Sequence, residues 1–275
     1  MEILVTLNES YLPPLQVMLT SLHLAHPGQP ITLHLMHSGI PEESLEAVGS
    51  QCGLYGIRFS PIRVDEDLFE GAPVSAQYPR QMYYRLLAPQ LLPRQLHRVL
   101  YLDPDVLILN SLLPLWQMDL EGKLFAAASH KGKAELASGL NQARLGTEGQ
   151  YFNSGVLLED LDEGRRQIRP QEIFRYAREH KKELLLPDQD ILNALYGDKT
   201  LPLDDTLWNH DARNFSTYLI RSGGACTLDW VMQNTAVLHF CGRSKPWQAG
   251  YFRRFGVLYK HYIQLTRRTG LYLGK

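Results

Sequence analysis

The chain has 275 residues, 44% of them hydrophobic and 21% charged, a composition typical of a globular protein with one large domain or one domain and a small appendage. Its 28 basic and 29 acidic residues give a formal net charge of -1, so no overall positive field favours nucleic acid as a partner. The cysteines, Cys52, Cys226 and Cys241, are too scattered for a disulfide framework or a zinc cluster, and the sequence shows neither a signal-peptide pattern nor a run of about 18 apolar residues, so we expect a cytoplasmic protein.

The first quarter of the sequence alternates between strand and helix patterns. Short apolar runs predict strands over residues 3–7, 31–36 and 57–64, and apolar residues at helical spacing predict helices over 11–26 and 41–50. This order predicts a right-handed unit of parallel strands. No G-x-G-x-x-G follows the first strand, so a dinucleotide site or a P-loop has little support.

The next elements extend the same pattern. They are a helix over 78–88, strands over 99–102 and 106–109, a helix over 111–116 and a strand over 124–128. The near-continuous apolar character of the first of these strands is typical of a strand covered on both faces. We therefore predict a single α/β domain with a mostly parallel central sheet flanked by helices.

The second half of the chain has weaker patterns. Residues 130–150 are rich in Gly, Lys, Ala and Asn without clear periodicity, which fits either a mobile lid or a surface insertion. The sequence predicts a strand with a polar interruption over 151–158, a charged helix over 162–183, a helix that begins at 187, and a short strand over 237–240.

Two carboxylates directly follow the apolar strand 99–102. Asp103 and Asp105 are two residues apart, so an extended backbone would point both to one side, and Pro104 between them cannot donate to a strand ladder. Like charges held together repel unless a cation lies between them, which favours a site for Mg²⁺ or Mn²⁺. The alternative is an acidic β-turn, because Asp and Pro are both common in turns.

A second candidate cluster begins at His239, at the end of a predicted strand. An imidazole beside two carboxylates makes a ligand set suited to Mn²⁺, whereas the alternative is a half-buried histidine bonded to backbone. Gly242 would let the backbone approach a phosphate, and Lys245 would supply positive charge for a diphosphate leaving group. A surface turn with a solvated lysine is the simpler alternative.

Two polar pairs stand at the ends of apolar elements. Asn153 and Ser154 interrupt one predicted strand, and Asp188 and Gln189 stand at a predicted helix start. These side chains are of the types that bind sugar hydroxyls. Either pair could equally serve in helix capping or turn formation.

Six segments, taken in order, resemble the family 8 retaining glycosyltransferases, which include glycogenin and bacterial lipopolysaccharide galactosyl- and glucosyltransferases. They run from the first strand to near residue 250, so the resemblance covers most of the chain, and the last segment is the most specific. The segments are 5–11 (VTLNESY), 84–86 (YRL), 101–106 (YLDPDV), 152–156 (FNSGV), 187–190 (PDQD) and 239–247 (HFCGRSKPW).

That resemblance implies the nucleotide-sugar-binding α/β fold called GT-A and a UDP-sugar as donor. It also implies that Asp103, Asp105 and His239 hold Mn²⁺, with Mg²⁺ as the alternative, against the diphosphate. Asp103 would in addition reach the ribose. The uridine pocket implied by the resemblance is lined by Thr6, Asn8 and Tyr11.

The resemblance further implies how the sugar is transferred. The implied catalytic residues are Asp188, Gln189 and Lys245, and the other implied donor contacts are Arg85, Asn153, Ser154 and Gly242. Gln189 would lie beneath the anomeric carbon, where an amide is too poor a nucleophile for the usual two-carboxylate scheme. We therefore expect front-face attack assisted by the leaving phosphate, with the metal and Lys245 stabilising the departing UDP.

Two departures from the family's pattern restrict the comparison. Asn8 stands where some members carry Asp, which keeps a polar partner for the uridine, and no tyrosine-rich tail for self-glucosylation is evident. We expect residues 1–250 to form the catalytic domain and 251–275 to form a basic aromatic extension. This extension resembles the membrane-associating tails of lipopolysaccharide enzymes, which suggests peripheral contact with the inner face of the membrane.

The predicted function is therefore transfer of glucose or galactose from a UDP-sugar to a carbohydrate or glycolipid acceptor. One rival is a metal-dependent phosphotransferase or phosphatase that uses the Asp-x-Asp motif. That class carries the motif at its first strand, usually before Gly-Thr, whereas Val106 and Leu107 follow it here. The other rival is a catalytically silent nucleotide-sugar-binding protein.

Overall fold

The computed structural model describes residues 1–65, 69, 81–129, 144–147 and 150–274. Its central sheet has seven strands in the order β3-β2-β1-β4-β7-β6-β8. The first four are parallel to one another, β7 is antiparallel to both of its neighbours, and β8 is parallel to β6. The strands are β1 (Glu2–Thr6), β2 (Ile31–His37), β3 (Ile57–Arg63), β4 (Arg98–Leu102), β6 (Phe125–Ala128), β7 (Val156–Asp160) and β8 (Thr200–Leu203).

A small second sheet extends from the carboxyl end of β4. It has three strands in the order β5-β10-β9, with β5 antiparallel to β10 and β10 parallel to β9. Its strands are β5 (Val106–Ile108), β9 (His210–Asp211) and β10 (Val237–His239). The predicted α/β class with a mostly parallel central sheet is confirmed.

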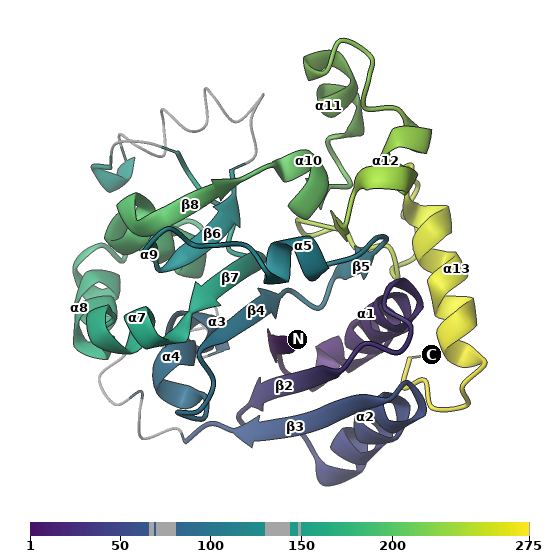
Figure 1. Ribbon diagram of the computed structural model, residues 1–275, viewed down its shortest axis with the longest axis horizontal. Coiled ribbons are helices and arrows are strands. Elements are labelled where there is room, and N and C mark those ends of the chain that lie inside the picture. The colour runs from purple at the N-terminus through teal and green to yellow at the C-terminus, as the bar shows by residue number, and fades with distance from the viewer. Residues whose placement is uncertain (66–68, 70–80, 130–143, 148–149, 275) are drawn as a thin grey trace.

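Helices cover both faces of the central sheet (Figure 1). The helices of the first half are α1 (Leu12–Ala25), α2 (Glu42–Leu54), α3 (Gln81–Leu86), α4 (Ala88–Leu91) and α5 (Leu113–Trp116), and the short 3-10 helix η1 (Glu9–Tyr11) precedes α1. The helices of the second half are α7 (Leu161–Gln167), α8 (Pro170–Glu179), α9 (Pro187–Tyr196), α10 (Asp205–Trp208), α11 (Phe215–Arg221), α12 (Leu228–Asn234) and α13 (Gly256–Arg267), with the 3-10 helix η3 (Gly197–Lys199) after α9.

The strands separate the core into two apolar clusters because successive side chains point to opposite faces. In β1, Ile3 and Val5 join the cluster that includes α1 and α2, whereas Leu4 joins the one that includes α3, α8 and α9. A third cluster packs α13 against the small sheet through side chains such as Tyr259 and Phe240. Burial on both faces explains why these strands are apolar throughout rather than alternating.

Three predicted elements are corrected by the structure. The strand predicted over 151–158 begins only at Val156, because the polar residues before it form a loop. The single helix predicted over 162–183 is two helices, since Pro170 forces the preceding Arg169 into an extended conformation. Of the helix predicted over 78–88, residues 78–80 lie outside the described residues and α3 ends at Leu86. Most of the segment 130–150, predicted as a lid or an insertion, also lies outside the described residues.

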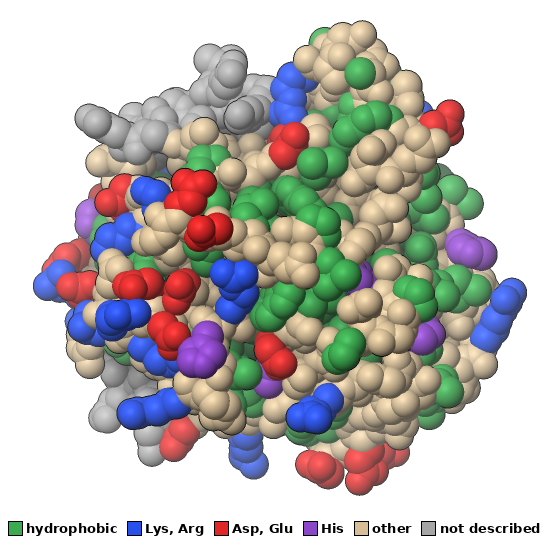
Figure 2. All heavy atoms as spheres, in the orientation of Figure 1, with side chains coloured by type: hydrophobic (Ala, Val, Ile, Leu, Met, Phe, Trp, Pro, Cys, Tyr) green, Lys and Arg blue, Asp and Glu red, His purple; other side chains and the backbone are tan. Residues whose placement is uncertain are grey.

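The C-terminal helix α13 lies along α1 (Figure 1). The side chain of Gln16 donates to the Leu271 carbonyl at 2.7 Å and accepts from the Leu273 amide at 2.7 Å, while the hydroxyls of Thr20 and Thr266 lie 2.8 Å apart. In the described part of the chain, no helix is both long and apolar enough to cross a membrane. On the face shown in Figure 2, acidic and basic side chains are interspersed.

Candidate functional site

The two carboxylates of the Asp-x-Asp motif lie in the turn between the large and small sheets. The Asp103 amide donates to the Gly155 carbonyl at 2.8 Å, and the Phe240 amide donates to the Asp105 carbonyl at 3.0 Å. The antiparallel register of β5 and β10 sets His239 opposite Val106, the residue after Asp105. Backbone pairing therefore brings His239 to the motif.

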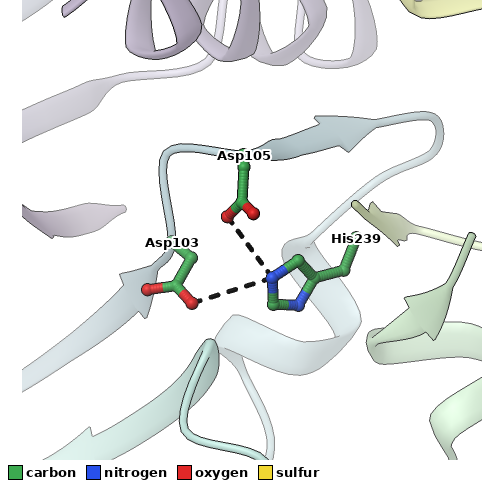
Figure 3. Close-up of side chains that lie close together, drawn as sticks. All are labelled: Asp103, Asp105 and His239. Carbon is green, nitrogen blue, oxygen red and sulfur yellow. Dashed lines mark ion pairs between the residues drawn. The ribbon is translucent and has the colours of Figure 1, made fainter. Parts of the chain in front are cut away.

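The three side chains point toward one another (Figure 3). The His239 Nε2 lies 3.3 Å from the Asp105 Oδ1 and 3.7 Å from the Asp103 Oδ2. One ligand atom from each residue lies within 4.8 Å of the others. A Cβ on Gly155 would collide with the His239 ring and the Asp103 carboxylate, so glycine there permits this approach. Two carboxylates and an imidazole at this spacing fit a divalent metal that accepts oxygen and nitrogen ligands.

Lys245 adds a cation to this cluster. Its Nζ donates to the Asp105 carboxylate and, at 3.0 Å, to the Phe240 carbonyl. Burial alone would raise the pKa of Asp105, but His239 and Lys245 outweigh burial and hold that pKa well below its usual range. Burial alone would lower the pKa of His239, but the neighbouring Cys241 and Asp105 hold it well above its ordinary value. Asp105 is thus an ionised carboxylate between two cationic groups.

Arg85, on α3, connects the two motifs that carry aspartates. Its guanidinium lies 3.1 Å from Asp103 and 3.0 Å from Asp188, donates to the Ser154 carbonyl and hydroxyl at 3.2 and 3.3 Å, and stacks over the Tyr101 ring. Because Leu186 is the N-cap of α9 and makes no side-chain cap, the capping alternative for Asp188 is wrong. The Asp188 carboxylate instead accepts from Arg85 and, at 3.2 Å, from the Ser154 hydroxyl.

The neutral side of the site consists of amides. The Gln189 Oε1 accepts from the Asn153 Nδ2 at 3.0 Å and from the Ser154 amide at 3.4 Å. The Asn153 Oδ1 accepts from the Gly155 amide at 3.0 Å and from the Asn209 Nδ2 at 2.8 Å. The Asn209 Oδ1 lies 2.9 Å from the His239 Nδ1. These bonds form a continuous chain from Gln189 to His239.

A cavity of about 370 Å³ opens between these groups. Eight of the predicted site residues line it, whereas Asn153, Ser154, Gln189, His239 and Gly242 do not. Gly242 has a φ of 87°, a left-handed conformation that favours glycine, and lies beside the Arg213 side chain. The lining residues are Thr6, Leu7, Asn8, Tyr11, Gln81, Arg85, Asp103, Pro104, Asp105, Pro187, Asp188 and Lys245.

The three predicted uridine residues all line this cavity. Thr6 ends β1, and its hydroxyl lies 3.5 Å from the Tyr101 hydroxyl. The Asn8 Oδ1 caps η1 by accepting from the amide and the hydroxyl of Ser10 at 3.1 and 2.6 Å. The Asn8 amide nitrogen is the part of that side chain left to contact a ligand. Tyr11 packs edge-on against Trp247, so η1 contacts the segment that carries Lys245.

Sequence reasoning missed four residues of the site: Gln81, Tyr101, Gly155 and Asn209. Tyr101 stood inside an apolar strand, yet its hydroxyl donates to the Asp103 Oδ1 at 2.6 Å. Gln81 lines the cavity but belongs to no recognised motif. Asn209 follows a tryptophan in an irregular stretch, where no periodicity marked it. Gly155 and Tyr101 lie inside the segments 152–156 and 101–106 of the family resemblance, and that was the signal that could have been used.

Asp190 belongs to the same motif as Asp188, but its contacts stabilise the fold and do not face the cavity. It is fully buried, accepts from the Leu185 and Leu186 amides at 2.7 and 2.9 Å, and forms a two-pronged ion pair with Arg144 at 2.7 and 2.9 Å. The Tyr151 hydroxyl also donates to it. Asp190 therefore stabilises the start of α9, which carries Asp188 and Gln189.

Comparisons with known proteins agree with this geometry. The chain is 28% identical to General stress protein A of Bacillus subtilis (strain 168) over 247 residues, covering 86% of this chain and 83% of that protein. It is 25% identical to a lipopolysaccharide 1,2-glucosyltransferase of Escherichia coli, covering 90% and 75% respectively. The crystal structure of the galactosyltransferase LgtC with donor and acceptor sugar analogues superposes with a TM-score of 0.80 at 27% identity, covering 96% of each chain.

The predicted family resemblance is confirmed at the level of the whole domain. Residues 2–250 match the family described as Glycosyl transferase family 8, and this range contains every residue of the site. The LgtC likeness covers nearly the whole chain, and the fold is therefore of the GT-A type. The chain belongs to glycosyltransferase family 8.

Proposed function

We propose that this protein is a metal-dependent retaining glycosyltransferase that moves glucose or galactose from a UDP-sugar to a carbohydrate or glycolipid acceptor. The observation that carries the proposal is the meeting of Asp103, Asp105 and His239 beside a cavity that also contains Lys245. Relatives named as a glucosyltransferase and a galactosyltransferase support a hexose donor and an acceptor in lipopolysaccharide or another cell-surface glycan.

Asp103, Asp105 and His239 would hold the metal, for which Mn²⁺ is our first expectation and Mg²⁺ the second. A bound divalent ion supplies positive charge against the diphosphate as its bond to the sugar breaks. Lys245 supplies a second charge at the same end of the cavity. Because its ammonium lies on Asp105 here, donor binding would draw it from the carboxylate to the diphosphate oxygens.

The sugar would lie toward Arg85, Asp188 and Gln189. The Asp188 carboxylate is held by Arg85 and Ser154 in an orientation suited to accept from a sugar hydroxyl. The Gln189 Oε1 already accepts two N–H groups, which makes attack by that oxygen on the anomeric carbon unfavourable. Front-face attack by the acceptor hydroxyl, with its proton passing to the leaving phosphate, remains the scheme that these contacts support.

The Asp-x-Asp phosphotransferase alternative gains no support from the geometry. A phosphoryl-accepting aspartate needs a carboxylate oxygen open to the substrate. The Asp103 Oδ1 instead accepts from Tyr101 at 2.6 Å and from Arg85 at 3.1 Å, while the Oδ2 faces His239.

UDP release from a panel of UDP-hexoses, with Mn²⁺ or with a chelator, tests the proposal without knowledge of the acceptor. We expect Mn²⁺-dependent release from one donor, and loss of that release in Asp105→Ala. If calorimetry shows that wild type binds UDP and Mn²⁺ while no UDP is released from any donor, even when cell extracts that contain glycan acceptors are added, the protein is a catalytically silent binder. If it binds neither, the proposed activity is wrong.

We further propose that residues 251–275 form an extension that contacts the membrane surface, placing the enzyme in the cytoplasm at the inner face. Phe252 is 95% exposed and Val257 is 77% exposed, and the exposed Arg253 and Arg254 lie between them in the sequence, so apolar and cationic side chains are exposed within one short segment. Truncation near Gly250 would also remove the contacts between α13 and α1, so substitution is the cleaner test.

Co-sedimentation with anionic vesicles compares wild type with Phe252→Ser/Val257→Ser. Leu54→Ser, at a 62% exposed leucine that ends α2, is the matched control. We expect the double variant to remain in the supernatant and the control to sediment like wild type. Equal sedimentation of all three proteins would show that this surface does not bind membranes.

A further inference from the structure

Asn209 lies between two parts of the site, although it is not among the residues that line the cavity. The charged half consists of Asp103, Asp105, His239 and Lys245, and the neutral half consists of the amides Asn153 and Gln189. It follows α10 directly, precedes β9, and is completely buried. Its side chain contacts one residue from each half: the Oδ1 faces the His239 Nδ1 at 2.9 Å, and the Nδ2 donates to the Asn153 Oδ1 at 2.8 Å. A buried amide that bridges two predicted site residues could set the orientation of both.

Two backbone N–H groups determine which side-chain atoms donate and which accept in the series of hydrogen bonds from Gln189 to His239, because a backbone N–H can only donate. The Gly155 amide points at one atom of the Asn153 side chain, which must therefore be the oxygen, and the Ser154 amide identifies the Gln189 oxygen in the same way. The Asn153 nitrogen then donates to Gln189. Since the Asn153 oxygen also faces Asn209, Asn209 presents its nitrogen to Asn153 and its oxygen to His239.

The last bond in the chain determines the state of the histidine. The Asn209 oxygen can only accept, so the His239 Nδ1 must carry the proton and donate it. The Nε2 atom faces Asp103 and Asp105, and when it gives up its proton to bind a metal, the neutral ring that results keeps its proton on Nδ1 and has its lone pair on Nε2. The opposite tautomer would point an N–H at the carboxylates and could not ligate a metal.

We propose that Asn209 is a positioning residue that performs two tasks at once. It holds His239 as the Nδ1–H tautomer with Nε2 ready for the metal, and it orients Asn153 so that this side chain donates to Gln189. This inference rests on the proposed function, because it assigns consequences to a metal at His239 and a donor sugar near Gln189. It joins the leaving-group end of the site to the sugar end through one buried side chain.

Two substitutions separate the tasks. Asn209→Ala removes both bonds, so we expect Mn²⁺ affinity to fall by about 10–100-fold, the usual effect of losing the partner of a ligating histidine. Asn209→Asp keeps an acceptor for the His239 Nδ1–H but has no N–H for Asn153. We therefore expect Asn209→Asp to bind Mn²⁺ within about 3-fold of wild type while kcat falls by on the order of 10-fold.

Asn110→Ala is the matched control. The Asn110 side chain also makes two hydrogen bonds, to the Met232 and Thr235 carbonyls at 3.1 and 2.8 Å, and touches none of the site residues. A merely structural role for Asn209 predicts that both alanine variants lose stability while keeping wild-type Mn²⁺ affinity. If Asn209→Ala does not fold, Asn209→Asp decides the matter through its separation of Mn²⁺ affinity from kcat.

Two measurements report on the site without relying on turnover. Electron paramagnetic resonance of free Mn²⁺, titrated with protein in the presence of UDP, gives the metal affinity. Nitrogen-15 NMR of His239 with Mg²⁺ and UDP distinguishes the protonated ring nitrogen from the ligating one, and we expect Nδ1 to carry the proton in wild type. Wild-type Mn²⁺ affinity in Asn209→Ala, or a proton on Nε2, would overturn this inference alone. No Mn²⁺ binding by wild type would overturn the proposed function as well.

Discussion

Asp105 and Glu159 are both carboxyl groups withdrawn from solvent, yet their surroundings have opposite effects. Asp105 is 5% exposed and lies between His239 and Lys245, which hold its pKa below the usual range against the effect of burial. Glu159 is 0% exposed near the end of β7, and neither of its oxygens has a hydrogen-bond partner among the described residues. Burial therefore raises the pKa of Glu159 well above its ordinary value, and the positive charge of Arg85, which acts in the opposite direction, does not outweigh it.

The comparison shows that partners, and not depth of burial, decide whether a carboxyl group in this protein is charged. It also sets the sign of two pH dependences. Asp105 contributes stability above its unfolded pKa of about 3.9, and this contribution is lost as the pH falls through its lower folded pKa. Glu159 binds its proton more tightly when folded, so its effect on stability becomes unfavourable as the pH rises above about 4.3.

The largest expected effect is on the rate of UDP release, and it comes from replacing Lys245, one of the two cationic side chains beside Asp105. We expect Lys245→Gln to lower kcat for UDP release by about 10²-fold, because charge developing on the leaving group loses one of its stabilising groups. Steady-state kinetics at saturating donor and Mn²⁺ measure it. Lys123→Gln is the control, since the half-buried Lys123 donates to the Asp198 carbonyl, outside the site. If kcat falls equally in Lys245→Gln and Lys123→Gln, Lys245 has no specific role in stabilising the leaving group.

The second effect concerns the stability of the metal-free protein. Asp105→Asn leaves His239 and Lys245 buried with less negative charge beside them, so at pH 7 we expect a loss on the order of 3 kcal/mol, roughly 6–12 °C in Tm. The difference from wild type should shrink toward pH 3, where wild type loses the same contribution. Calorimetry with a chelator measures both values, and Asp229→Asn, at an exposed position, is the control. A constant difference across pH would contradict the pairing.

The smallest effect is expected at the unpaired carboxyl group. Glu159→Gln keeps the shape of the side chain but cannot ionise, so the Tm of the variant relative to wild type should increase by roughly 2–4 °C between pH 5 and pH 8. That is the shift that about 1 kcal/mol produces in a chain of this size. Thermal denaturation at the two pH values measures this difference in Tm, and Glu46→Gln, at an exposed position, is the control. A pH-independent difference would mean that Glu159 is ionised in the folded protein.

The charged half of the site was accessible from sequence because its chemistry is local. Asp103 and Asp105 stand directly after a buried strand, and His239 and Lys245 are six positions apart within one segment. Their types alone suggested a cation and a diphosphate. The resemblance implied that the two segments meet at one metal, but the register of β5 and β10 that brings them together is known only from the structure.

The neutral half was less accessible because its geometry depends on tertiary contacts. Asn153 and Gln189 were named, but nothing local revealed that Asn209 joins them to the histidine. Tyr101 was hidden for the opposite reason: an aromatic residue in a buried strand predicts packing, and its hydroxyl bond to Asp103 is not visible in a periodicity. The fold class was predictable because strands covered on both faces are apolar along their whole length.

The pairing of β5 with β10 has a consequence for how this protein acquires its active form. Lys245 and Asp105 meet although 140 positions separate them along the chain, and three strands of the central sheet, β6, β7 and β8, are built from residues in between. Contacts so distant in sequence carry a large loop-closure entropy and form slowly. A nascent chain that ends before β10 therefore carries the Asp-x-Asp motif without its histidine. During synthesis, the proposed metal site would be among the last features to form, and binding of a metal there would report that folding has reached completion.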